Sequence, residues 1–127
     1  MTAEDGGVYT LYQRARLLLE EGRPRDAAAL LQEAVEQEPG RGSLYEPLGR
    51  ALFATSQISR ARAAFEEALA VDPSDDYAHF GVGRCCERQG ALTEAAKHYK
   101  IAAALRDRAE YRDALLRVTA RLPASNA

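Results

Sequence analysis

The sequence predicts an all-α protein built from three similar helix-turn-helix units and a final helix. Three observations carry this prediction. The 127 residues include 46% hydrophobic and 28% charged residues, which is typical of one soluble domain and argues against a disordered chain or a membrane protein. The chain resembles itself when it is shifted by 34 residues. Within each unit, apolar residues recur with the period of an amphipathic helix.

The 34-residue period is based on identical residues at corresponding positions. Arg16, Arg50 and Arg84 coincide at this offset. The same shift superposes further residues, namely Ala27, Ala61 and Ala95; Ala34, Ala68 and Ala102; Gly49 and Gly83; Gly22 and Gly90; and Pro39 and Pro73. Such agreement is improbable by chance. The expected units are residues 8–41, 42–75 and 76–109, which belong to a single domain over 8–122 with flexible tails at 1–7 and 123–127.

Turn and cap signals divide each unit into two helices. In the first unit Gly22 marks the turn, and Pro24 suits the first turn of the following helix. In the second, Ser43 and Glu46 predict a capping box, residues 55–57 interrupt the helices, and Pro73 ends the second helix. Gly90 marks the turn of the third unit, and residues 110–122 predict a helix.

Small residues at repeated positions indicate close helix packing. We expect Ala27, Ala61 and Ala95 to allow the second helix of each unit to approach the first, with Gly49 and Gly83 opposite them. Leu31, Phe65 and Tyr99 would then fill the space between units. Because one helix pair cannot bury both of its faces, stacked neighbours must supply the core.

The final helix carries an apolar stripe and a charged remainder. Tyr111, Leu115, Val118 and Leu122 form the stripe. This pattern is typical of a capping helix that covers the last repeat with its apolar face and exposes its polar face to solvent. A partner-binding or dimerising helix is the alternative.

No motif of enzyme chemistry occurs in the sequence. A phosphate-binding loop, a zinc-like spacing and a nucleophile elbow are all lacking. Cys85 and Cys86 are adjacent, which excludes a disulfide between them in a helix and favours a packing role in a reducing cytoplasm. His79 and His98 are expected to play separate structural roles. We therefore expect no enzyme activity, no cofactor and no metal.

The middle unit resembles the tetratricopeptide repeat (TPR) family. The residues that carry the resemblance are Tyr45, Leu48, Gly49, Leu52, Ala61, Phe65, Ala68 and Pro73. The other units fit less fully, with Arg14 in place of Leu and Asp107 in place of Pro, and the resemblance covers residues 8–109. It implies a right-handed α-α superhelix, a TPR solenoid, whose first helices line a concave groove that holds a peptide.

Basic and aromatic residues fall at the groove positions that this resemblance implies. The candidate peptide-binding residues are Tyr12, Arg16, Arg50, Phe53, Tyr77, Phe80, Arg84 and Arg88. Packed helices lie about 8–10 Å apart, and an extended chain advances about 3.3 Å per residue. A series of arginines on that pitch would match acidic groups about three residues apart in an extended peptide. We expect an adaptor or scaffold that binds an acidic or C-terminal peptide segment of another protein.

Other interpretations stay open. Arg50 could pair with Glu46 on its own helix, Arg16 with Glu20 and Arg84 with Glu87. The carboxylate clamp of one TPR subgroup would fall on Tyr12, Arg16, Pro47, Tyr77 and Gly81, which do not match it.

Self-assembly into a homo-oligomer is the alternative function. Binding of nucleic acid or phosphate by the repeated arginines is a third and weaker alternative, because the net charge of −2 argues against it. No segment suggests a membrane. High Arg and Ala with little Lys resemble proteins of GC-rich bacterial genomes.

Overall fold

The computed structural model describes residues 7–123, which hold seven α-helices, one short 3₁₀-helix and no strand. The elements are α1 (Val8–Glu20), α2 (Pro24–Gln37), η2 (Gly42–Leu44), α3 (Tyr45–Ala54), α4 (Ile58–Val71), α5 (Asp76–Arg88), α6 (Leu92–Leu105) and α7 (Ala109–Arg121). Apart from Gly7 and Pro123, the tails expected to be flexible lie outside the described residues.

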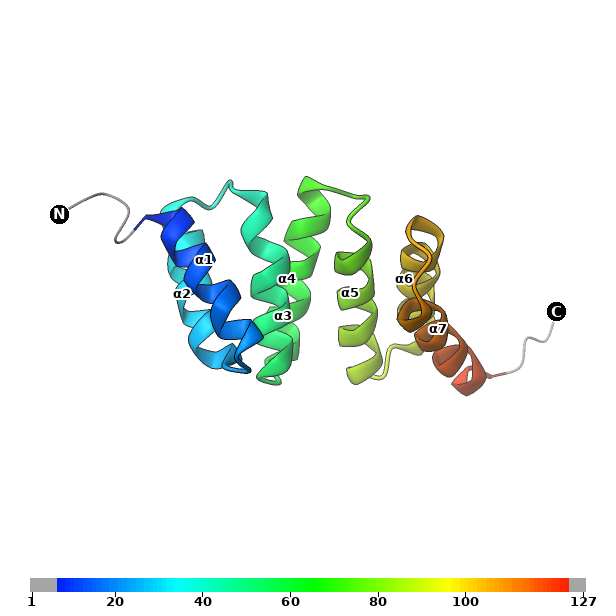
Figure 1. The fold of residues 1–127 in the computed structure, drawn as a ribbon. Helices are drawn as coiled ribbons and strands as arrows, with labels where there is room; N and C mark the ends of the chain where they lie inside the picture. The colour runs from blue at the N-terminus through cyan, green and yellow to red at the C-terminus, as the bar shows by residue number, and fades with distance from the viewer. Residues whose placement is uncertain (1–6, 124–127) are drawn as a thin grey trace.

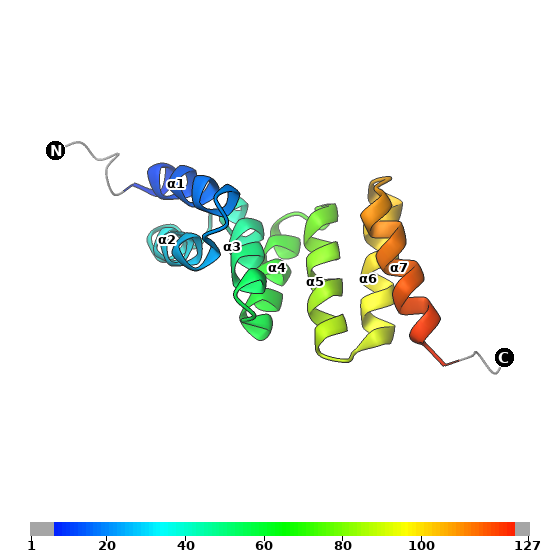
Figure 2. The ribbon, with the colours of Figure 1, turned by 60° about the horizontal axis from the view of Figure 1, so that its bottom comes forward.

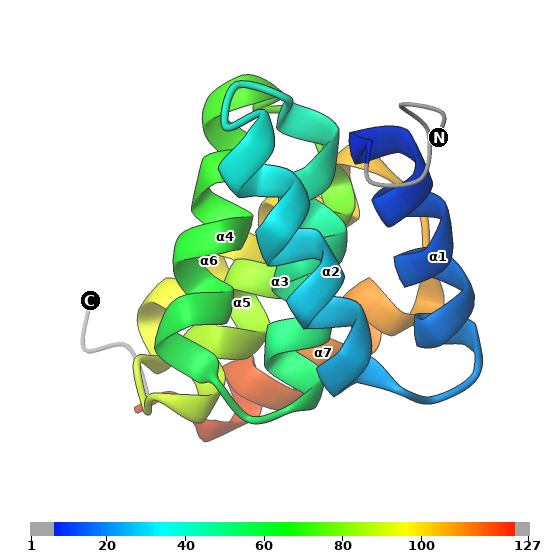
Figure 3. The ribbon, with the colours of Figure 1, turned by 90° about the vertical axis from the view of Figure 1, so that its left-hand side faces the viewer.

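The helices form one extended array. Each packs on its neighbour in the chain, most extensively within the pairs α1/α2, α3/α4 and α5/α6. Figures 1 and 2 show the pairs following one another from α1/α2 at one end to α6 and α7 at the other. Figure 3 shows the same array from the α1/α2 end. No helix within residues 7–123 is both long and apolar enough to cross a bilayer.

The same kind of turn connects the two helices in each of the three pairs. A residue with positive φ follows the first helix of each pair: Gly22 at 74°, Ser56 at 63° and Gly90 at 80°. The N–H of the next residue donates to a carbonyl oxygen five residues earlier in the chain. These hydrogen bonds are Arg23 to Leu18 at 2.8 Å, Gln57 to Leu52 at 2.9 Å and Ala91 to Cys86 at 2.8 Å. This arrangement is a Schellman motif, and it explains the two glycines in the repeat.

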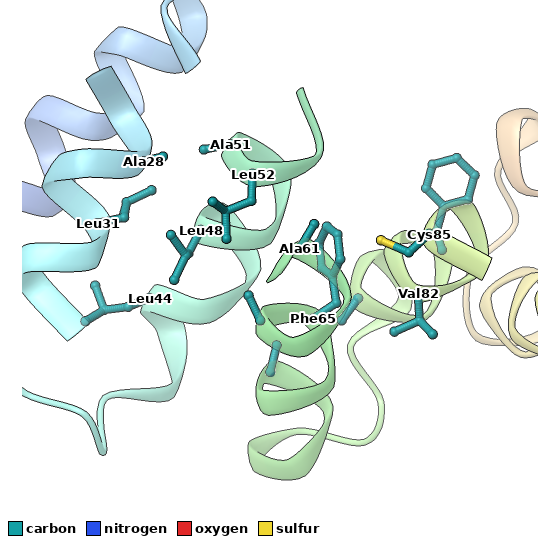
Figure 4. Close-up of a cluster of buried hydrophobic side chains, with 14 of the residues drawn as sticks. Ala28, Leu31, Leu44, Leu48, Ala51, Leu52, Ala61, Phe65, Val82 and Cys85 are labelled. Atoms are coloured by element: carbon teal, nitrogen blue, oxygen red, sulfur yellow. The ribbon is translucent and has the colours of Figure 1, made fainter. Parts of the chain in front are cut away.

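Phe65 of α4 joins two units of the core. Its ring is only 2% exposed, and Cβ atoms built on Gly49 of α3 or Gly81 of α5 would lie 2.8 and 2.6 Å from it. Figure 4 shows this ring beside Ala61, between the units. The expected small positions Ala27, Ala61 and Ala95 are fully buried, which confirms their packing role.

The predicted capping box of α3 is wrong. Ser43 lies within η2 and is exposed, α3 begins at Tyr45, and no side chain caps it. An N-cap residue needs an extended backbone, which the 3₁₀ turn does not provide. Pro47 is therefore the third residue of α3, where a missing N–H removes no intrahelical hydrogen bond.

The expectation that the two histidines have separate roles is also wrong. His79 Nδ1 of α5 and His98 Nδ1 of α6 are 3.2 Å apart, and the two rings stack. His79 Nε2 lies 2.9 Å from the Pro73 carbonyl oxygen, which only accepts, so Nε2 carries the proton. When His79 is neutral, its Nδ1 accepts and His98 Nδ1 donates.

Helix α7 covers the third repeat as the apolar stripe predicted. Tyr111, Ala114 and Val118 are buried, and the Tyr111 hydroxyl donates to Asp76 at 2.6 Å. Cys85 and Cys86 are free and buried in α5, and burial raises the pKa of the Cys85 thiol to about 12. This suits a packing role, because the reactive form of cysteine is the thiolate.

Candidate ligand-binding groove

Three adjoining pockets form a groove along the odd-numbered helices. The first encloses about 660 Å³ between α1, η2 and α3, and the second about 450 Å³ between α3 and α5. The third encloses about 330 Å³ between α3, α5 and α7. Arg50 lines both the first and the second pocket, while Phe53, Arg84 and Arg88 line both the second and the third. The groove is therefore continuous from α1 to α7.

Arginine side chains lie over aromatic rings along this groove. The Arg84 guanidinium of α5 is 4.1 Å from the Phe53 ring centroid on α3, and Arg50 of α3 is 5.2 Å from that of Tyr77 on α5. Arg88 also lies over Phe53, at 5.5 Å. These cation–π contacts cross between repeats, at about 0.5–1 kcal/mol each for exposed groups. They hold the guanidinium groups in place without consuming their N–H donors.

The structure brings seven of the eight candidate residues into the groove. Tyr12 and Arg16 line the first pocket. The other five line the second pocket: Arg50, Phe53, Tyr77, Arg84 and Arg88. Phe80 lies beneath this surface at 7% exposure and packs against Tyr77, Tyr99 and Tyr111. It supports the groove from below.

Pairing of the repeated arginines with acids on their own helices occurs at one position of three. Arg50 lies 3.8 Å from Glu46. Within residues 7–123, neither Arg16 nor Arg84 forms an ion pair. Glu87, the expected partner of Arg84, is bound instead by α7. Local charge pairing therefore does not account for the repeated arginines.

Charge is unevenly distributed along the groove. The first pocket holds four acidic residues (Glu20, Glu46, Asp72 and Asp75) against Arg16 and Arg50. Burial and the nearby Asp75 raise the pKa of Glu46, in agreement with a crowded acidic end. The second pocket holds Arg50, Arg84 and Arg88 and no acid. Acidic side chains therefore gather beside α1 and the start of α3, and unopposed basic side chains beside α5.

Sequence reasoning missed the contribution of α7. Arg117 and Arg121 line the third pocket together with Arg84 and Arg88. The available signal was their spacing of four residues on the helix expected at 110–122, outside its apolar stripe. Because α7 lies outside the 34-residue repeat, no comparison of corresponding positions could place these residues at the groove.

The repeated helix pairs and the continuous groove define a helical-repeat protein of the solenoid class. Two sequence profiles, both described as tetratricopeptide repeat, match residues 46–112 and 18–66. The chain belongs to the tetratricopeptide repeat family. The Xenopus laevis protein named tetratricopeptide repeat protein 33 is 31% identical over 91 residues, or 72% of this chain. The chain spans about a third of the length of that relative, 35%.

Solved structures with low sequence identity share the fold. The Arabidopsis OM64 TPR domain is 16% identical with a TM-score of 0.87, over 91% of this chain and 96% of that one. The first TPR of Spaghetti (RPAP3), bound to the HSP90 peptide SRMEEVD, is 18% identical with a TM-score of 0.85, over 90% and 91%. MamA is 20% identical with a TM-score of 0.86, over 94% and 70%. The predicted right-handed α-α superhelix is thus confirmed.

Proposed function

We propose that this protein is a non-catalytic interaction module that binds an acidic or C-terminal peptide segment of another protein in the groove. One observation carries the proposal. The second pocket contains three arginines and no acidic residue, and neither Arg84 nor Arg88 has a hydrogen bond or ion pair to a side chain within residues 7–123. Oriented guanidinium groups with free N–H edges are suited to carboxylates, which they bind with two parallel hydrogen bonds.

The distribution of charge supports a more specific position for the bound segment than the repeat alone does. Acidic residues of the bound segment would lie over α3 and α5, beside Phe53 and Tyr77, which supply flat apolar contacts. Neutral or basic residues would lie in the first pocket, beside Glu20 and Asp75. The proposal therefore has an acidic segment over α3 and α5 in place of evenly spaced acids along all three repeats.

The structural neighbour with a bound HSP90 peptide supports a peptide as the class of ligand. Its ligand, SRMEEVD, is acidic at the C-terminal end. The clamp positions of this chain, among them Pro47 and Gly81, do not carry the family's clamp residues. Binding here would therefore depend on Arg50, Arg84 and Arg88 and on the aromatic rings they stack against.

Fluorescence anisotropy with defined peptide pools tests the proposal. The probe is a fluorescein-labelled pool of peptides about ten residues long and rich in Asp and Glu, which reach about 33 Å when extended. Pools with Asn and Gln at the same positions and the peptide SRMEEVD serve as comparisons. We expect the Arg50→Ala, Arg84→Ala double variant to lose about tenfold or more in affinity for the acidic pool.

The matched control is Arg14→Ala, because Arg14 is an exposed arginine of α1 that lines none of the three pockets. It should leave binding unchanged. All variants must keep the helicity and melting temperature of the wild type. Equal binding of the acidic and amide pools, or equal losses in the control and the double variant, would overturn the proposal.

A further inference from the structure

Of the three pockets of the groove, the third is lined by the largest number of arginines. Its lining consists of Phe53, Arg84, Glu87, Arg88, Arg117 and Arg121, from α3, α5 and α7. Four arginines against one glutamate leave a net charge of +3 at neutral pH. The whole chain has a net charge of −2, so positive charge is concentrated in this pocket and in the adjoining second pocket. We refer to the third pocket as the α5/α7 pocket.

Glu87 holds two of these arginines in place and is itself saturated. Its carboxylate accepts from the Tyr99 hydroxyl at 2.7 Å and from Arg117 Nη2 and Nε at 2.8 and 3.0 Å. Arg121 Nη1 donates at 3.3 Å. The hydrogen bonds from Arg117 lower the pKa of Glu87, and Tyr99 and Arg121 act in the same direction. Because these partners occupy the carboxylate, it does not neutralise Arg84 or Arg88.

Arg84 and Arg88 are fixed but unpaired. The guanidinium groups of Arg84 and Arg88 both lie over the Phe53 ring, at 4.1 and 5.5 Å from its centroid. Arg84 also lies 5.5 Å from the centroid of the Phe80 ring. Neither has a hydrogen bond or ion pair to a side chain of residues 7–123. Stacking engages the flat face of a guanidinium group and leaves its N–H edge available to an acceptor.

The chemistry of this pocket favours a phosphoryl group over a carboxylate. A carboxylate brings one charge and two oxygens, whereas a phosphorylated side chain brings a charge of about −1.5 to −2 and three strong acceptor oxygens. Two unpaired arginines and two more held by Glu87 supply several N–H donors for such a group. The pocket's volume of about 330 Å³ lies within the range of ligand-binding pockets, so the space admits a phosphorylated side chain.

We propose that the α5/α7 pocket is a subsite for a phosphorylated side chain of the peptide segment bound in the groove. The subsite rests on the proposed function, because Phe53, Arg84 and Arg88 belong to this pocket and to the second one. The phosphorylated residue lies at the α7 end of the segment, and the acidic first pocket lies at the other. A regulated modification of the partner would then control binding.

The first test measures phosphate itself, by NMR of the arginine Nε–H groups. The protein is titrated with inorganic phosphate, and separately with acetate, at a constant ionic strength of about 0.15 M. We expect phosphate to shift the signals of Arg84, Arg88 and Arg117 at concentrations about tenfold lower than acetate does. Equal responses to the two anions, or shifts spread over distant arginines such as Arg14 and Arg25, would overturn the proposal.

Variants of the pocket give the matched comparison. Arg88→Ala should abolish the preference for phosphate and should fold normally, since Arg88 forms no side-chain hydrogen bond within the described chain. Arg112→Ala is the control, because Arg112 lies on α7 outside the pocket and pairs with Asp107. The proposal fails if Arg88→Ala retains the preference or if Arg112→Ala loses it.

The second test separates this proposal from the proposed function. The acidic peptide pool is compared with the same pool carrying one phosphoserine in place of a glutamate. We expect phosphoserine to improve affinity about tenfold in the wild type and to give no gain in Arg88→Ala. If the acidic pool binds through Arg50 and Arg84 but phosphoserine adds nothing, the subsite is wrong and the groove function stands. If phosphate binds the pocket but neither pool binds, the groove function is wrong, and the peptide subsite that rests on it is wrong as well.

Discussion

Single residues determine how closely the helices of a pair approach. Gly49 of α3 is buried against Phe65, and a Cβ atom there would lie 2.8 Å from the ring. Gly81 of α5 also approaches this ring closely, since a Cβ atom there would lie 2.6 Å from it, so a shift of the ring is restricted from a second helix. We therefore predict that Gly49→Ala destabilises the protein by at least about 1 kcal/mol, although alanine is the better helix former.

Denaturant unfolding measures this change, with Gly40→Ala as the matched control. A Cβ atom on Gly40 meets nothing within 4 Å, so the control should stay within about 0.5 kcal/mol of the wild type. If Gly49→Ala is as stable as the control, the helices separate more easily than the packing implies.

Ser56 holds the turn position that glycine holds in the other two pairs. Its φ of 63° lies in the left-handed region, where an L side chain is strained and glycine is not. We predict that Ser56→Gly raises the free energy of unfolding by about 0.5–1 kcal/mol. Ser59→Gly in α4 should lower it, because glycine is a poor residue inside a helix. A stabilisation by both, or by neither, would contradict the assignment of strain.

At the scale of helices, the contact between α5 and α6 depends on a pair of histidines. Burial lowers the pKa of His98, and a positive charge on His79 would lower it further. Glu94, one turn earlier on α6, acts in the opposite direction, whereas Lys97 and Arg62 add to the lowering. The folded state therefore binds a proton at His98 less readily than the unfolded state, whose histidine pKa is about 6.5.

The sign of the pH dependence follows from this difference. As the pH falls below about 6.5, the unfolded state takes up the proton first, so the protein loses stability between pH 7 and the folded pKa. We predict that His98 titrates below 6.5 by NMR, that its neutral form carries the proton on Nδ1, and that His79→Gln raises its pKa. An Nε2–H tautomer of neutral His98 would contradict the hydrogen bond between the rings.

The helices and most of their turns could be predicted from local sequence signals, whereas some contacts between helices could not. Helix pairs, turns at Gly22 and Gly90 and the buried alanines follow from periodicity, because packing within a repeat uses the same positions each time. The histidine contact joins positions 79 and 98, which the repeat does not relate. Ser43 failed as a cap because it lies within a 3₁₀ turn itself, and no single residue type specifies such a turn.

The candidate groove could be predicted in part. The repeat register indicated Arg50 and Arg84, but their stacking partners, Tyr77 and Phe53, lie on the neighbouring unit. Cross-repeat contacts depend on how successive pairs rotate, and a single sequence does not specify that rotation. For the same reason the charge of α7 at the groove emerged only from the folded chain.

At the scale of the whole molecule, the array is stable only while its repeats stay joined. Phe65 is a fully packed residue between the second pair and the third, since both Gly49 of α3 and Gly81 of α5 approach its ring closely. In a repeat protein each unit contacts only its neighbours, so cooperative unfolding depends on such interfaces. Phe65→Ala should cost about 3–5 kcal/mol and weaken the junction between α1–α4 and α5–α7.

We predict that unfolding of Phe65→Ala no longer follows a single transition. Amide exchange should show α1 to α4 opening separately from α5 to α7, whereas the wild type exchanges the helices at the junction cooperatively. Leu31→Ala is the comparison, because this buried leucine lies at the α2 end of the core, away from the junction (Figure 4). It should reduce stability by about 2–5 kcal/mol while α4 and α5 still open together. If α4 and α5 also open together in Phe65→Ala, other contacts between the repeats, such as the ion pair of Arg62 with Glu94, are sufficient to couple them.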